Sequence, residues 1–191
     1  MSTFKKLGLT LGAFALTAGT AGMLATFGAF SSTTSNPGNS FAAGTVVIGD
    51  NDGGSALYNL SNQKPGVQTD KCVRVTYTGS LDSTVKLYSS AVTAGGQYVD
   101  LAITSGTGTQ TNCSDFTPDV SGSSVYSGTL KNFADTYSSY ANGLGDNPLA
   151  ATKWVTNDAV TYRFRVDVQD NNAAQGATTG THSFTWEAQN Q

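Results

Sequence analysis

Charged residues are scarce in this chain, and basic residues are the scarcer class. Its 191 residues include 10 Lys plus Arg and 13 Asp plus Glu, which leaves a net charge of −3 at pH 7. A chain without a basic surplus has no field that attracts phosphates, so nucleic-acid binding is disfavoured. The same scarcity excludes a coiled coil or another long-helix protein, because such proteins are rich in Glu, Lys and Arg.

Histidine and cysteine are also rare, which limits the chemistry available. The single histidine, His182, cannot form the two-histidine H-E-x-x-H helix of a zinc protease, and one His with two Cys cannot supply four tetrahedral ligands. His182 opens an alternating strand beside a polar loop, which favours an ordinary strand histidine over the base of a catalytic triad. We therefore expect no metal, no cofactor and no enzymatic activity.

Apolar residues suffice for one folded domain, and an export signal precedes it. Hydrophobic residues make up 38% of the chain, and residues 7–30 carry no charge and follow two lysines. We predict a signal peptide over 1–29 that signal peptidase removes, with a retained membrane anchor as the alternative. The rest of the chain would divide into an N-terminal arm, 30–43, and a folded domain, 44–191.

The two cysteines, Cys72 and Cys113, suit an exported protein with one disulfide. A bridge closing this loop of about 40 residues would stabilise the fold by about 3–4 kcal/mol in the chain-entropy model. Two free thiols are the alternative.

From Phe41 onward, hydrophobic residues recur with a period of two, the pattern of half-buried β-strands. The clearest runs are 161–169 and 182–188, which we expect to form an antiparallel pair. Similar runs predict further strands at 45–48, 56–60, 72–78, 85–87 and 98–104. Short strands at this spacing predict a two-layer antiparallel β-sandwich. One short helix is expected within 131–144, where aromatic residues fall at helical spacing.

The acidic segment Asp50-Asn51-Asp52-Gly53-Gly54 lies between two of these runs. The spacing of Asp50 and Asp52 matches the first half of a calcium loop, but the distant bidentate Glu of such loops is missing. Asn and Gly adopt a positive φ at little cost, so a tight turn is the stronger interpretation and calcium binding the weaker one.

The arm that follows the leader is polar and has no evident partner within the chain. Such an arm can add a strand to the exposed sheet edge of a neighbour, where backbone hydrogen bonds supply affinity. A disordered terminus is the alternative. The candidate donor residues are Phe30, Ser31, Ser32, Thr33, Thr34 and Phe41.

Short motifs occur in a fixed order along the chain. They are Ala29-Phe30-Ser31, Asn39-Ser40-Phe41-x-Ala43-Gly44-Thr45-Val46, Lys64-Pro65-Gly66, Val75-Thr76-Tyr77-Thr78-Gly79-Ser80-Leu81, and Ala174-Gln175-Gly176 before Phe184-Thr185-Trp186-Glu187-Ala188-Gln189-Asn190. In this order they resemble the TasA and camelysin family of SipW-processed exported proteins. The resemblance implies a secreted jelly-roll or immunoglobulin-like β-sandwich of the cell surface or biofilm matrix. Its TasA relatives polymerise head to tail into fibres by donating the N-terminal strand to the next subunit, so the implied partners are further copies of the chain and other matrix proteins.

Two other functions remain open. Camelysin relatives carry a metallopeptidase label, but the lone His182 departs from what zinc proteolysis requires. A monomeric surface adhesion module is the other alternative, in which Tyr88, Tyr126 and Trp154 are aromatics that could contact glycans.

Overall fold

The computed structural model describes residues 42–190 except 121–122 and 146–152. The predicted leader, 1–29, and the candidate donor residues from Phe30 to Phe41 lie outside the described residues. The chain divides into two units, 1–42 and 43–191, and the helices and strands of the described residues all belong to the second unit. Within the described residues, no helix has the length and apolar character that a membrane crossing requires.

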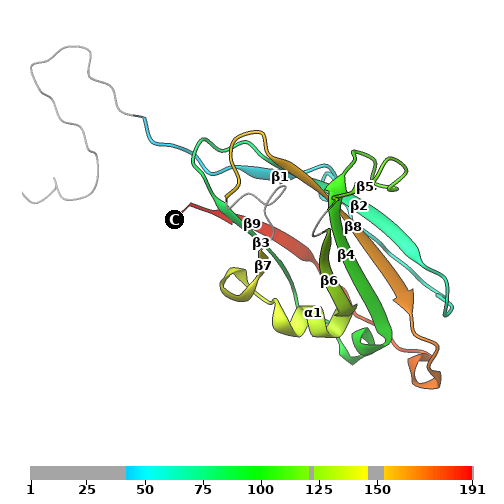
Figure 1. The fold of residues 1–191 in the computed structure, drawn as a ribbon. Helices are drawn as coiled ribbons and strands as arrows, with labels where there is room; N and C mark the ends of the chain where they lie inside the picture. The colour runs from blue at the N-terminus through cyan, green and yellow to red at the C-terminus, as the bar shows by residue number, and fades with distance from the viewer. Residues whose placement is uncertain (1–41, 121–122, 146–152, 191) are drawn as a thin grey trace, which may run out of the picture. The chain divides into compact units, whose positions relative to one another are not determined.

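The larger sheet has six strands, and all its pairs are antiparallel. Its order is β1-β2-β8-β4-β5, and β6 also pairs with β4 (Figure 1). The strands are β1 Ile48–Asp50, β2 Thr69–Tyr77, β4 Val99–Thr107, β5 Thr117–Pro118, β6 Ser124–Thr129 and β8 Ala159–Val168.

The smaller sheet has three antiparallel strands in the order β7-β3-β9. They are β7 Leu144–Gly145, β3 Thr84–Ser89 and β9 Phe184–Gln189. Among the described residues, short 3-10 helices lie in connections: η1 Ala94–Tyr98, η2 Tyr140–Asn142 and η4 Asn172–Ala174. The antiparallel, all-β expectation is confirmed.

The core lies between the facing surfaces of the two sheets. Phe164 of β8 meets Phe184 of β9 with ring centroids 4.7 Å apart, and Tyr162 meets Trp186 at 5.5 Å. Aromatic pairs in such tilted arrangements add to the stability that burial of their area provides. The two sheets are therefore sandwich-like.

The short helix expected within 131–144 is present as α1, Leu130–Thr136. The Thr129 hydroxyl caps its first turn by accepting a hydrogen bond from the Asn132 N–H at 3.2 Å. The helix buries Leu130 and Phe133 in the core, which anchors an element too short to be stable alone.

The expected C-terminal antiparallel pair is wrong. Both strands exist, but β8 pairs with β2 and β4, whereas β9 pairs with β3 in the other sheet. The aromatic faces of β8 and β9 therefore stack across the core instead of lying side by side. Alternation of hydrophobic residues identifies a strand's buried face and does not identify its neighbour.

The expected strand at 56–60 is also wrong, because this segment has no ladder partner. Leu57 and Tyr58 are consecutive, yet both pack against the core. Two successive inward side chains are incompatible with the alternation of a strand. Residues 51–68 instead form a long irregular connection between β1 and β2.

Candidate functional site

The candidate site is the outer edge of β9, which no strand of the described residues pairs with. The Ser90 N–H donates to the Ser183 carbonyl at 3.0 Å, next to the β3–β9 ladder. Hydrogen-bonded pairs alternate along an antiparallel ladder, so the backbone N–H and C=O groups of Phe184, Trp186 and Ala188 point away from β3. β9 thus offers three residues with outward backbone groups.

A cleft of about 700 Å³ lies beside this strand. Its walls are the irregular segment 52–60 and the segment 178–184, and Val73 and Trp186 contribute core side chains to it. Within the lining, Asp52 is the charged residue, so the cleft suits an uncharged polar chain better than an ionic ligand.

A hydrogen bond joins the two walls of the cleft. The Tyr58 hydroxyl lies 2.8 Å from Nε2 of His182, and Nδ1 of His182 lies 3.1 Å from the Gly180 carbonyl. This arrangement fits an imidazole that donates from Nδ1 and accepts at Nε2. Burial raises the pKa of the Tyr58 phenol, so this side chain stays protonated and able to donate. Sequence reasoning placed His182 at the start of a strand but gave no signal for its Tyr58 partner.

The indole of Trp186 supplies a further unsatisfied group. Its Nε1 is buried and has no hydrogen-bond partner in the described part of the chain. Trp186 also lines the cleft. A buried donor without a partner costs free energy.

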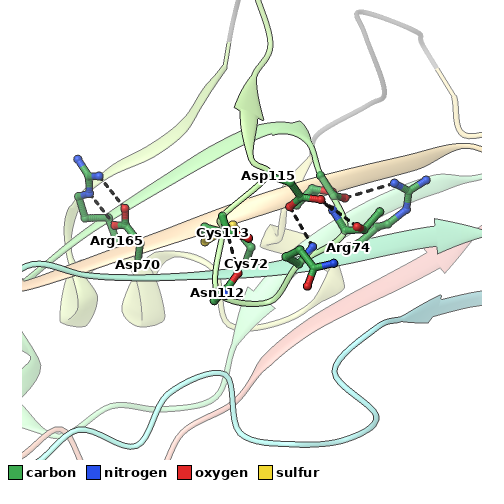
Figure 2. Close-up of a disulfide and its surroundings, with 12 residues drawn as sticks. Asp70, Cys72, Arg74, Asn112, Cys113, Asp115 and Arg165 are labelled. Carbon is green, nitrogen blue, oxygen red and sulfur yellow. Dashed lines mark hydrogen bonds and ion pairs between the residues drawn. A yellow bond between two sulfur atoms is a disulfide. The ribbon is translucent and has the colours of Figure 1, made fainter.

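The disulfide between Cys72 and Cys113 is present and joins residues 41 apart in the sequence (Figure 2). It fastens residues 108–116, which we call the strap, to β2. The strap leaves the end of β4 and crosses the outer surface of the larger sheet. There the Gly108 carbonyl accepts from the Thr161 hydroxyl at 2.6 Å, and the guanidinium of Arg163 lies 4.9 Å from the centre of the Phe116 ring.

The Asp115 carboxylate organises the strap. It accepts hydrogen bonds from the Thr109 N–H at 2.8 Å and the Gln110 N–H at 3.0 Å. These bonds to the charged form hold the pKa of Asp115 below its ordinary value. The strap is therefore fixed by ionised Asp115 as well as by the disulfide.

The residues Asp50 and Asp52 form a turn. An Asp50 carboxylate oxygen accepts from the Asp52 N–H at 3.3 Å, and the Asp52 carboxylate accepts from the Gly54 N–H at 2.7 Å. Gly53 and Gly54 both have positive φ. Burial, followed by the neighbouring Asp52, raises the pKa of Asp50. Among the described residues there is no group of three or more His, Cys, Asp or Glu side chains placed to hold a metal ion.

The three aromatics considered for glycan contact lie in different environments. Trp154 is 0% exposed, and Tyr126 packs edge-on against Phe133 with centroids 4.9 Å apart. Tyr88 lies on the outer surface of the smaller sheet, where its hydroxyl donates to Glu187 at 2.9 Å. The structure does not bring these aromatics together into one surface.

Comparison with protein families finds none that matches the chain, and comparison with curated proteins finds no match either.

Proposed function

We propose that this chain is an exported structural protein of the cell surface or extracellular matrix, similar to the TasA and camelysin family. It assembles head to tail when the arm of one copy, residues 30–43, adds as a strand to the next copy. The fold that this proposal requires is a jelly-roll or immunoglobulin-like sandwich in which an edge strand can accept a further strand.

The single observation that carries the proposal is the open edge of β9. Phe184, Trp186 and Ala188 present outward backbone groups beside a cleft, and an extended peptide satisfies such groups with main-chain hydrogen bonds. Phe30 and Phe41 would supply apolar anchors at the two ends of the arm.

We propose that head-to-tail addition gives filaments. The arm and the edge of β9 are different surfaces, so their contact is heterologous, and an assembly that does not close on itself keeps one free arm and one free edge at its ends. Filaments would grow by the same contact repeated.

Removal of residues 30–41 from the exported protein tests this proposal. We expect the wild-type protein to form filaments in electron micrographs and the truncated protein to remain a monomer by light scattering, because only the acceptor edge is left. Unchanged filament formation without the arm would exclude strand donation. A wild-type protein that stays monomeric at high concentration would instead support the surface adhesion module.

A further inference from the structure

The edge of β2 beyond β1 is covered in an unusual way. β1 pairs with Val75, Thr76 and Tyr77, and no other strand of the described residues pairs with the N-terminal part of β2 on this side. The outward N–H groups there are those of Asp70, Cys72 and Arg74, because the Tyr77 N–H donates to Asp158 on the β8 side and the direction alternates. Without a cover, this stretch would be an open edge.

The outward N–H groups of Cys72 and Arg74 are bonded to atoms that do not belong to a strand. The Cys72 N–H donates to the Thr111 carbonyl of the strap at 2.9 Å, and the Arg74 N–H donates to the Asn51 side-chain carbonyl at 2.8 Å. The Asn51 amide in turn donates to the Thr109 carbonyl at 2.9 Å. Asn51, the strap and the disulfide therefore cover the β2 edge together at Cys72 and Arg74.

We infer that the strap is an edge guard, which prevents a second copy of the chain from pairing with β2. Unpaired strand edges recruit other chains, and proteins block them with loops, bulges or charges. The disulfide keeps the strap in place: Cys113 lies in the strap, and Cys72 is one of the edge residues that it covers. β2 is contacted by Thr111 and Cys113 of the strap, and by Asn51, which is bonded to the strap.

The guard gives assembly its direction, and in this respect the inference rests on the proposed function. With β2 covered, the N-terminal part of this strand offers no further pairing site, and strands add at β9 into a single filament. With both edges open, subunits would also pair laterally through β2, and filaments would become sheets or bundles.

The test uses the full exported protein and the substitution Asn51→Ala. This change frees the Arg74 N–H and releases Thr109, and the disulfide stays intact. Asn112→Ala is the matched control, because among the described residues the Asn112 side chain accepts from the Ser114 N–H, within the strap, and from no group of β2. A second variant, Cys72→Ala with Cys113→Ala, removes the fastening itself.

We expect hydrogen–deuterium exchange in the peptide 69–77 of monomeric Asn51→Ala to be about tenfold faster than in the wild type or in Asn112→Ala. The same variant, and the double cysteine variant more strongly, should associate as concentration rises, by light scattering. Protection of 69–77 should return in the associated fraction, because the edge is then paired again.

Two results would overturn the guard. One is faster exchange at 69–77 without any gain in association, and the other is association in which 69–77 stays unprotected. If Cys72→Ala with Cys113→Ala does not fold, Asn51→Ala decides alone. Failure of the wild type to form filaments would remove the proposed function, but the comparison among these variants would still test the guard.

Discussion

At the residue scale, buried hydroxyl groups tie the end of β2 to the turn that follows it. Tyr77 is 0% exposed, and its hydroxyl donates to the Leu81 carbonyl and lies 2.7 Å from the Ser83 hydroxyl. Ser83 is also 0% exposed. Because these groups are out of contact with water, each depends on the others for its hydrogen bonds.

Tyr77→Phe should therefore lower the free energy of unfolding by about 1–2 kcal/mol, because the Leu81 carbonyl and the Ser83 hydroxyl lose a partner. Urea unfolding followed by tryptophan fluorescence measures the change. Tyr98→Phe is the control: among the described residues the Tyr98 hydroxyl has no hydrogen bond, and its loss should change stability very little. Equal effects of the two substitutions would contradict the role of the buried network.

A charge pair on the outer surface of the larger sheet gives a pH-dependent contribution. Arg165 donates from Nε and Nη2 to the two oxygens of Asp70, both at 2.7 Å. This bidentate contact holds the pKa of Asp70 below its ordinary value of 3.8. Because the folded-state pKa is depressed, the stabilisation is present above the unfolded value and is lost as pH falls through the folded one.

Thermal unfolding between pH 6 and pH 2 tests this contribution. In the wild type, the melting temperature should fall once the pH drops below the ordinary Asp value, as Asp70 and Asp115 take up protons. Arg165→Gln should be less stable at pH 6 by about 1 kcal/mol or less, because the pair is partly exposed. Its deficit relative to the wild type should shrink toward pH 2. A deficit that is constant with pH would show that the guanidinium acts through packing alone.

At the element scale, β9 ends the smaller sheet: one face lies in the core, and no strand of the described residues pairs with its outer edge. Its side chains Phe184 and Trp186 pack on β8, which fixes the strand without using the outward backbone. The backbone hydrogen bonds to β3 come from the alternate residues of β9. A change restricted to the outward backbone should therefore affect assembly and leave the fold intact.

Ala188→Pro makes this change, because proline lacks the outward N–H and is tolerated on the open side of an edge strand. We expect the folded monomer, judged by circular dichroism, and a loss of filament formation of at least about tenfold in rate, since one main-chain bond of the junction is gone. Ala188→Ser keeps the N–H at similar size and should assemble like the wild type. Normal assembly of the proline variant would place the acceptor edge elsewhere.

At the scale of the whole molecule, the sequence predicted the elements better than their arrangement. Alternation of hydrophobic residues located β2, β3, β4, β8 and β9. The two cysteines of a chain that carries an export signal predicted the Cys72–Cys113 bridge. Both signals are local or compositional. Which sheet receives β9 depends on how aromatic faces stack across the core, and no local pattern encodes that. The strap was missed for the same reason: Asn51 and Thr111 are polar residues whose importance comes only from the edge they meet.

The bridge between Cys72 and Cys113 also limits how far the chain can be stretched. If tension were applied along the chain, the covalent link would shorten the length that unfolding can release. Cys72 and Cys113 are 41 positions apart, the segment between them includes β3 and β4, and fully extended it would span about 140 Å. The disulfide keeps this segment from being extended, so the unfolded chain would reach a shorter maximum length under tension than it would without the bridge.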